Sequence, residues 1–381
     1  MATTRPEPAP APPRTDDPMP LLGVDHLELH VGNATQASWY LRHVFGFREV
    51  AYRGLETGSR DRVSRVLEQG EVRLVLTAGL DGEGPVARAA ARHGDGVAVI
   101  AITVPDAEAA YRTAVARGAR GVRAPWTERD AAGEARLATI AAYGDVVHTF
   151  VERGDYAGAF LPGFRAVEHP EADAGLFTGI DHVVANVDLG HMDEWVGFYE
   201  RVMGFTEMIH FSDEDISTEY SALMSKVVAD GEGRIKFPIN EPADGARRSQ
   251  IEEYLEYNGG AGVQHIALVT DDIVRTVREL TARGVRFLRT PAAYYDDLPE
   301  RIGEIAEDLS ALRELGILAD RDDEGYLLQI FTAPLGDRPT LFLEVIERHG
   351  ARGFGAGNFK ALFEAIEREQ ALRGNLDVRS A

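Results

Sequence analysis

The chain contains an internal repeat that begins with two nearly identical tetrapeptides, Gly-Val-Asp-His at residues 23–26 and Gly-Ile-Asp-His at residues 179–182. In each copy a stretch with aromatic residues follows and ends in a Gly-Phe pair, at 46–47 and at 204–205. Apolar residues alternate after each tetrapeptide with the period of a β-strand, and the later stretch has the period of an α-helix. Each copy therefore predicts a strand followed by a helix.

The second half of each copy repeats a further order of elements. The matching segments are strand starts at 93–97 and 259–263, helices at 107–117 and 272–283, Ala-Arg-Gly turns at 116–118 and 282–284, and final strands with Glu-Arg at 152–153 and 347–348. This order predicts two βαβββ modules in each copy. We therefore expect an α+β fold of two tandem domains, each a cupped, barrel-like mixed sheet around a cavity.

Composition and charge exclude several classes of protein. The 381 residues suffice for two to three domains at roughly 150 residues each, and 40 basic against 62 acidic residues give a net charge of −22. Nucleic-acid binders need the opposite sign, and anionic membrane surfaces are disfavoured as well. The absence of cysteine excludes disulfides, thiolate metal sites and cysteine nucleophiles. We find neither a membrane span nor a signal peptide and expect a cytoplasmic protein.

Three strands of the second copy carry side chains that can bind a metal. These are His182, His265 and Glu344. The matching residues of the first copy are His26, Val99 and Thr149. Two imidazoles and one carboxylate on one face are typical of non-haem Fe(II), and leave positions open for a chelating substrate and O₂. The sequence thus predicts a metal in the second copy and none in the first.

A structural role for these residues stays open, because a histidine in a strand is most often a hydrogen-bonded core residue. Two observations favour the metal. The three residues occupy repeat-equivalent strands, and Glu344 lies within the apolar run 341–346, where a buried carboxylate without a partner is costly. His26 lacks such companions, and we interpret it as structural.

These features divide the chain into segments. We expect a disordered proline-rich tail at 1–20, a βαβββ-repeat domain without a metal at 21–158, a linker at 159–178 and a metal-binding domain at 179–381. Within the last domain, a glycine-rich stretch precedes an amphipathic helix at 357–373, which we expect to act as a lid over the cavity.

The sequence resembles the 4-hydroxyphenylpyruvate dioxygenases, of the vicinal-oxygen-chelate superfamily, over about residues 20–375. The most specific stretches are Glu-Tyr-Ser-Ala-Leu at 219–223, Phe-Pro-Ile-Asn-Glu-Pro at 237–242, Ser-Gln-Ile at 249–251, Gly-Val-Gln-His-Ile-Ala at 262–267, Tyr-Leu-Leu-Gln-Ile-Phe-Thr at 326–332 and Gly-Phe-Gly-Ala-Gly-Asn-Phe-Lys-Ala-Leu-Phe at 353–363. The resemblance implies an oxidoreductase that converts 4-hydroxyphenylpyruvate and O₂ to homogentisate and CO₂ in tyrosine and phenylalanine catabolism.

The resemblance also implies the site. Fe(II) would be held by His182, His265 and Glu344. The substrate would contact Ser221, Asn240, Gln250, Gln264, Gln329, Phe331, Phe342, Phe354, Asn358 and Phe359, of which Gln264 and Phe359 would act in catalysis. Strand alternation argues against Gln264, because the neighbour of His265 should point to the other face of the sheet. The implied partners are a 2-oxo acid and O₂, and we expect a homo-oligomer, a dimer or tetramer.

Three alternatives remain. The similar 4-hydroxymandelate synthases use the same iron and substrate, but tend to have an aliphatic residue where this chain has Phe359 and to lack its Pro-Ile-Asn run at 238–240. A non-catalytic binding module of the same superfamily would not need an intact ligand set. An extradiol ring-cleaving dioxygenase would need a further histidine near the iron, for which His210 is the candidate.

Overall fold

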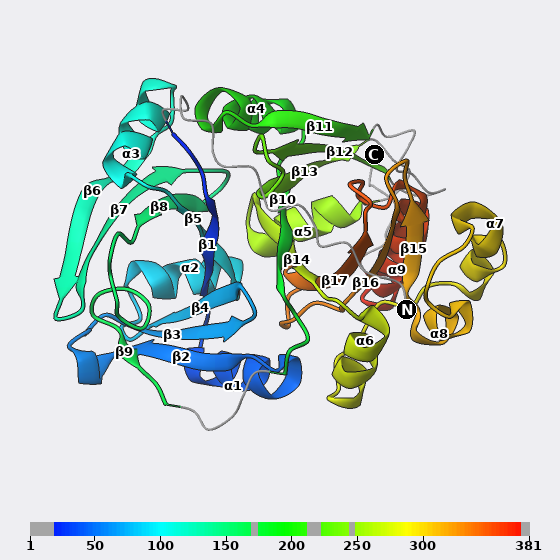
Figure 1. Cartoon of the computed structure of the whole chain (residues 1–381), viewed down its shortest axis with the longest axis horizontal. Helices are drawn as coiled ribbons and strands as arrows, with labels where there is room; N and C mark the ends of the chain where they lie inside the picture. The colour runs from blue at the N-terminus through cyan, green and yellow to red at the C-terminus, as the bar shows by residue number, and fades with distance from the viewer. Residues whose placement is uncertain (1–18, 169–173, 212–221, 244–247, 375–381) are drawn as a thin grey trace, which may run out of the picture.

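The computed structural model describes residues 19–168, 174–211, 222–243 and 248–374. Within these ranges two curled mixed sheets lie side by side, one from each copy of the repeat (Figure 1). Residues 1–18 of the predicted disordered tail lie outside the described residues, and Met19 at its end is buried with an exposed fraction of 1%.

The first sheet has the strand order β6-β7-β8-β5-β1-β4-β3-β2-β9. Its elements are β1 Gly23–His30, α1 Ala34–Phe45, β2 Arg48–Arg53, β3 Arg62–Gln69, β4 Val72–Gly79, α2 Pro85–His93, β5 Gly96–Thr103, α3 Ala107–Ala116, β6 Gly121–Asp130, β7 Gly133–Ala141, β8 Val147–Glu152 and β9 Arg165–Ala166. The two predicted βαβββ modules are β1–β4 and β5–β8. They meet where β1 pairs with β5.

The second sheet has the order β11-β12-β13-β10-β14-β17-β16-β15. Its elements are β10 Gly179–Asn186, α4 Met192–Phe198, β11 Thr206–Phe211, β12 Ala222–Ala229, β13 Lys236–Ala243, α5 Gln250–Asn258, β14 Gly262–Val269, α6 Ile273–Ala282, α7 Leu298–Ile302, α8 Leu309–Leu315, β15 Leu318–Arg321, β16 Tyr326–Phe331, β17 Phe342–His349 and α9 Phe359–Leu372. The α7–α8 insertion makes the second copy longer. The α+β fold expected from the repeat is confirmed.

The Gly-Phe pairs mark the turns that end the first helical segment of each copy. Gly46 and Gly204 adopt left-handed conformations, with φ of 79° and 73°, which residues with a Cβ rarely adopt. Each turn returns the chain to the sheet, and the following Phe47 and Phe205 are buried in the core. The pairs therefore fix where each helix stops.

The two central strand pairs carry matching irregularities. In the β10–β14 pair, Asp181 and Gln264 are extra residues that have no partner across the ladder. In the β1–β5 pair, Asp25 and Ala98 take the equivalent places. Such bulges re-aim side chains next to a site and change which residues share a face. The repeat is thus preserved down to the register of its strands.

The segment between the two sheets is partly packed. The predicted linker at 159–178 contains the short strand β9, which pairs with β2, and its residues Phe160 and Leu161 are buried against the first sheet.

Farther along the contact between the two halves, His148 of β8 lies 2.8 Å from the hydroxyl of Tyr199. Burial lowers the pKa of His148 to about 4, so a neutral ring bridges the halves. No helix in the described ranges is long and apolar enough to cross a membrane.

Candidate metal centre

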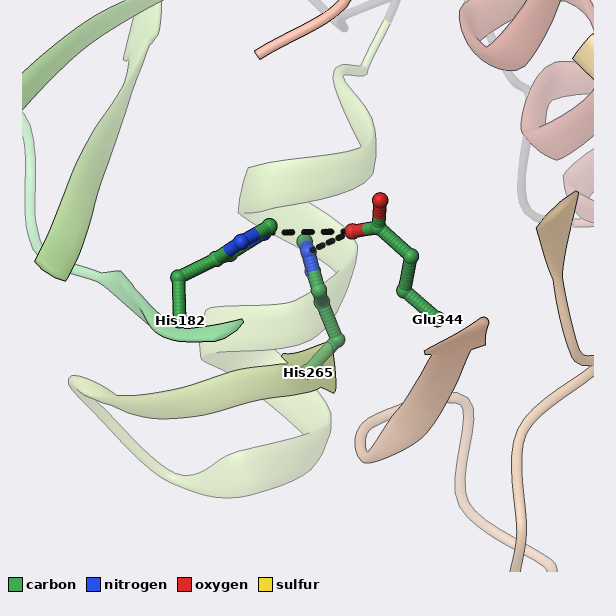
Figure 2. A group of neighbouring side chains, drawn as sticks. All are labelled: His182, His265 and Glu344. Atoms are coloured by element: carbon green, nitrogen blue, oxygen red, sulfur yellow. Dashed lines mark ion pairs between the residues drawn. The ribbon is translucent and has the colours of Figure 1, made fainter. Parts of the chain in front are cut away.

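His182, His265 and Glu344 converge from β10, β14 and β17 (Figure 2). Their ligand atoms all lie within 4.8 Å of one another. The Nε2 atoms of His182 and His265 are 3.1 and 3.3 Å from Oε2 of Glu344. All three side chains are buried, with exposed fractions of 3–9%. Three strands therefore bring together the three residues that the sequence placed apart.

The charges at this centre depend on one another. Burial alone would raise the pKa of Glu344, but the two histidines hold it at about 2. Burial would lower the pKa of His182, but Glu344 and Asp181 raise it above its usual value. The pKa of His265 is lowered by burial, although Glu344 opposes this effect. The carboxylate thus stays ionised next to imidazoles whose Nε2 atoms face it.

The other ring nitrogen of each histidine is held in place from within the same strand. Nδ1 of His182 lies 2.6 Å from Oδ1 of Asp181, and Nδ1 of His265 lies 3.0 Å from Oε1 of Gln264. Both partners are the extra residues of the two bulges. A hydrogen bond at Nδ1 fixes the tautomer and leaves Nε2 available as a ligand. The bulges thus allow two consecutive side chains to serve one site.

Asp181 is a site residue that the sequence interpretation missed. It bonds Nε and Nη2 of Arg348 at 2.7 and 2.8 Å and Nζ of Lys236 at 3.0 Å. Burial would raise the pKa of Asp181, but His182, Lys236 and Arg348 hold it well below its usual value. The signal was present, because the repeated tetrapeptide includes this aspartate and the repeated Glu-Arg pair includes Arg348.

The first sheet has the same network without the metal ligands. Arg153 bonds Asp25 at 2.7 and 2.8 Å, and Asp25 lies 2.5 Å from Nδ1 of His26. Across the sheet, Val99 and Thr149 stand in register where the second copy has His265 and Glu344. The aspartate–arginine pair is therefore a structural feature of both copies.

We expect Asp181→Asn to weaken metal binding by about 10–100-fold, the usual effect of losing a partner that orients a ligand. Asparagine removes the charge that holds the Nδ1 proton of His182. Competition against a chromogenic chelator measures the affinity. Asp25→Asn is the matched control, because it alters the same network in the first sheet. Equal affinities in the two variants would contradict the role given to Asp181.

The residues present fit a divalent metal. Oε1 of Glu344 is buried and has no hydrogen-bond partner among the described residues, so one carboxylate oxygen is left for another ligand. Such a buried acceptor is costly unless something binds it. Two neutral imidazole nitrogens with one carboxylate are a donor set that suits non-haem Fe(II). A metal bound between the three side chains would give the carboxylate and the two imidazole nitrogens the partner that their contacts with one another do not provide.

A cavity adjoins the three ligands. Its lining includes seven of the residues expected to contact substrate: Asn240, Gln250, Gln264, Gln329, Phe331, Phe342 and Phe354. The bulge explains why Gln264 lines the cavity although strand alternation placed it on the other face. Lining residues that sequence reasoning did not select are Val184, Phe211, Leu223, Ser225, Val227, Pro238, Leu362, Phe363 and Ile366. Alternation could have indicated Val184, two residues after His182.

Asn358, another expected contact, is not among the residues that line this cavity. Asn358 lies beside Tyr294, whose hydroxyl is 2.5 Å from its Oδ1. Ser221 and the side chain of Phe359 lie outside the described residues. The backbone of Phe359 begins α9, the helix that carries Leu362, Phe363 and Ile366 over the cavity. A helix, α9, lies at Phe359–Leu372 within the range 357–373 expected for the lid, and its action as a lid stays a prediction.

The amides of the cavity differ in what they have left to bind. Nδ2 of Asn240 bonds Oδ1 of Asn186 at 3.2 Å. Oε1 of Gln250 is buried and has no hydrogen-bond partner within the described part of the chain. Gln250 is the first residue of α5 after the Ser249 cap, so its backbone is fixed. It therefore offers a free acceptor on an otherwise largely apolar wall.

The histidine that ring-cleaving chemistry would need is not at this centre. His210 is exposed on the edge strand β11 and does not line the cavity. Among the described residues, the histidines in the lining are His182 and His265, both of them ligands. The geometry therefore gives no support to the extradiol alternative.

Two families match the two halves of the chain. Residues 15–161 match the N-terminal part of hydroxyphenylpyruvate dioxygenase. Residues 179–330 match the glyoxalase/bleomycin resistance protein/dioxygenase superfamily. The division between the two matches falls between the two sheets of the structure.

Similar proteins span nearly the whole chain. A 4-hydroxyphenylpyruvate dioxygenase of Aspergillus fumigatus is 47% identical, over 93% of this chain and 94% of its own. The enzyme of that name from Danio rerio is also 47% identical, over 94% of both chains. Among solved structures, a mutant of 4-hydroxymandelate synthase from Streptomyces coelicolor is 39% identical, with a TM-score of 0.84 over 92% of this chain and 100% of that one.

Proposed function

The chain belongs to the family of 4-hydroxyphenylpyruvate dioxygenases, and from this premise we propose how its second domain performs the reaction. The enzyme is an oxidoreductase that converts 4-hydroxyphenylpyruvate and O₂ to homogentisate and CO₂, a step of tyrosine breakdown. The observation that carries the proposal is the buried His182–His265–Glu344 group, which lines a largely apolar cavity and has one carboxylate oxygen without a partner among the described residues.

The site would hold Fe(II) through Nε2 of His182, Nε2 of His265 and a carboxylate oxygen of Glu344. Bound there, it supplies positions for the 2-oxo acid group and O₂ and the one-electron chemistry that O₂ needs. Asp181 and Gln264 keep the Nδ1 sides of the two rings occupied, so both imidazoles present Nε2 to the metal. These second contacts preserve the ligand geometry while substrate enters and product leaves.

The cavity wall positions the aromatic ring of the substrate. Phe331 and Phe342 lie against His265, with ring centroids 5.9 and 4.8 Å away, and Phe354 lies 5.1 Å from His182. These rings exclude water from the metal, which protects a reactive centre from side reactions. The free Oε1 of Gln250 accepts a hydrogen bond from the ring hydroxyl. Substrate is therefore held at both ends, by its 2-oxo acid group and by its phenol.

Several features of the enzyme remain proposals. We infer that residues 21–158 form a non-catalytic domain and residues 179–381 the catalytic one. The partners are a small 2-oxo acid and O₂, in a cytoplasmic homo-oligomer, a dimer or tetramer. Size-exclusion chromatography with light scattering tests the oligomer, and expression of residues 179–381 alone tests whether the catalytic domain folds without its partner.

Product identification separates the proposed reaction from its closest alternative. Incubation with Fe(II), O₂ and 4-hydroxyphenylpyruvate should consume oxygen and yield homogentisate. Formation of 4-hydroxymandelate instead would favour the 4-hydroxymandelate synthase alternative. A mutant of such a synthase is the 39% identical solved structure. Absence of oxygen uptake in iron-loaded protein would favour a binding module. Chromatography against both authentic acids gives the answer.

We expect Phe359→Ile to shift product from homogentisate towards 4-hydroxymandelate at unchanged iron content. The two reactions share metal and substrate and differ in the carbon that is hydroxylated, so ring position decides between them. An aromatic pair contributes about 0.5–1.5 kcal/mol, and about 1.4 kcal/mol changes a product ratio tenfold. Position 359 lies three residues before Leu362, which lines the cavity.

The product ratio is the measurement that distinguishes this role from packing. Leu362→Ile is the control, because it alters a neighbouring lining residue without removing an aromatic ring. If Phe359 only stabilises α9, its replacement should lower total activity and leave the ratio as in the wild type.

A further inference from the structure

The first sheet encloses a cavity of its own at the place that corresponds to the metal centre. The space measures about 300 Å³, compared with about 70 Å³ left beneath α9 in the second domain. Its wall includes Val99 and Thr149, which match two metal ligands of the second copy. About 300 Å³ lies at the lower end of the range of small-molecule sites. The cavity therefore has room for a compact ligand but no ligand set for a metal.

A fixed histidine, His26, lies at the floor of this cavity, and the lining also includes Glu28, whose Oε1 accepts a hydrogen bond from the hydroxyl of Thr77 at 2.6 Å. His26 has an exposed fraction of 5%, and its Nδ1 lies 2.5 Å from Asp25, a carboxylate that Arg153 also pairs with. Because an ionised carboxylate can only accept, Nδ1 carries a proton, and in the Nδ1–H tautomer Nε2 is the acceptor. Within the described part of the chain, no group bonds Nε2 of His26, and Phe160 holds the ring edge-on at 5.0 Å. This nitrogen is therefore left for a ligand in the cavity that His26 lines.

The wall between floor and mouth is mostly apolar. Its buried apolar members are Val75, Leu137, Phe160 and Leu161. The hydroxyls of Thr139 and Thr149 bond each other at 3.1 Å, and that of Ser64 bonds Thr77 at 2.8 Å. Because these hydroxyls already bond one another, they do not require a hydrogen bond from a ligand. The middle of the cavity thus suits a flat apolar body.

The mouth presents positive charge in a chain whose net charge is −22. Of its three arginines, Arg62 pairs with Asp61 at 2.8 Å and Arg53 lies 3.8 Å from Glu128. Arg123 makes no ion pair with any described residue. Its guanidinium instead lies over the ring of Trp126, 3.6 Å from the centroid. An arginine held flat on an aromatic ring keeps its donors free for a carboxylate.

We propose that the first cavity binds a hydroxyaryl carboxylic acid without transforming it. The phenol hydroxyl donates to Nε2 of His26, the ring lies between the apolar walls, and the carboxylate bonds Arg123 at the mouth. Each part of this ligand meets a group that otherwise lacks a partner or an apolar surface that otherwise faces water. Homogentisate belongs to this chemical class, but the inference does not depend on the reaction in the second domain.

Equilibrium dialysis of the iron-loaded full chain with labelled 4-hydroxyphenylacetate tests the proposal. Any binding to the second domain is the same in all variants. The difference in bound ligand between variants therefore reports binding to the first cavity. We expect Arg123→Glu to bind one equivalent less per chain than the wild type, with affinity at the first cavity at least about tenfold lower. Arg120→Glu, an exposed arginine outside the cavity, is the matched control and should bind as the wild type does.

Two further measurements separate the site from a general charge effect. Trp126→Ala should weaken the same equivalent, because it removes the support of Arg123 without changing charge. Phenylacetate, which lacks the hydroxyl that meets His26, should bind the first cavity more weakly than 4-hydroxyphenylacetate does. Equal stoichiometry in the wild type, Arg123→Glu and Arg120→Glu would overturn the proposal. Turnover of 4-hydroxyphenylpyruvate should be unchanged in all three, so failure of the proposed reaction would appear separately.

Discussion

Glu344→Ala should abolish turnover and iron retention while both sheets remain folded. Glu344 is the carboxylate among the three ligands, and its Oε2 lies 3.1 and 3.3 Å from Nε2 of the two imidazoles. Without it, two histidines alone would have to hold the metal. The loss of affinity should therefore exceed the roughly 10–100-fold that follows from losing a partner outside the ligand set.

The fold should survive because the change removes a buried charge rather than an apolar contact. The neighbouring residues Val345 and Ile346 keep β17 in the core. Metal analysis after gel filtration, with circular dichroism, measures both effects. Thr149→Ala is the matched control, since Thr149 occupies the equivalent register in the first sheet. An active, iron-replete Glu344→Ala protein would refute the assignment of the metal centre.

The repeat made the topology and the ligand set accessible from sequence. Register matches His265 with Val99 and Glu344 with Thr149, and these equivalences follow once the later repeated segments, 93–97 with 259–263 and 152–153 with 347–348, are aligned as well. Because homologous strands occupy homologous places in each sheet, ligands that lie 162 residues apart in sequence (His182 and Glu344) can be assigned to one centre. The sequence of one strand does not show which distant residues lie near it. Comparing the two copies of the repeat within this chain supplied that information.

What the sequence did not reveal depends on local departures from regular strands. The bulge at Gln264 reverses the face that alternation predicts, and nothing in the letters of β14 signals an unpaired residue. Asp181 likewise reaches the site only because it is the extra residue of β10. The packing of Phe160 against the first sheet depends on contacts distant in sequence, such as that with His26, which periodicity within the predicted linker does not indicate. Periodicity describes ideal strands and fails where a strand is deformed to build a site.

The helix α9 closes the metal cavity with side chains that belong to two clusters of the core. Phe363 has an exposed fraction of 2% and packs with Phe211, Leu223 and Ile251. Leu362 and Ile366 line the cavity itself. The end of the helix is fastened to α5 by Arg373, whose Nη2 and Nε lie 2.7 and 3.2 Å from the carboxylate of Glu253. Removing α9 should therefore open the cavity along its whole length.

Ending the chain at Asn358 should abolish turnover but leave iron at the centre. This truncation retains Phe354, which contacts His182, and Arg348, which bonds the backbone oxygen of Gly353 at 2.7 Å. A cut at residue 352 would remove Phe354 and Gly353, and would confuse loss of the lid with damage to the ligands. When the chain ends at Asn358, water can enter the cavity and the substrate ring is no longer held in place. Turnover should therefore fall by at least about 100-fold, because small errors of position have effects of this size.

The truncated chain loses buried side chains such as Phe363, and burying one phenylalanine contributes about 1.5–3 kcal/mol to the free energy of unfolding. If the truncated chain is unstable for this reason, point variants test the same expectation. Arg373→Ala detaches the end of α9 and should raise KM or lower kcat, with the iron content of the wild type. Arg368→Ala is the control, because that exposed arginine of the same helix contacts Glu364 at 3.9 Å and the backbone oxygen of Arg289 at 3.3 Å but makes no ion pair with any described residue of α5. Single-turnover rates and metal analysis distinguish closure from ligand damage. Full activity in the truncated chain would show that α9 only packs, whereas loss of iron would show that the helix supports the ligands rather than the cavity.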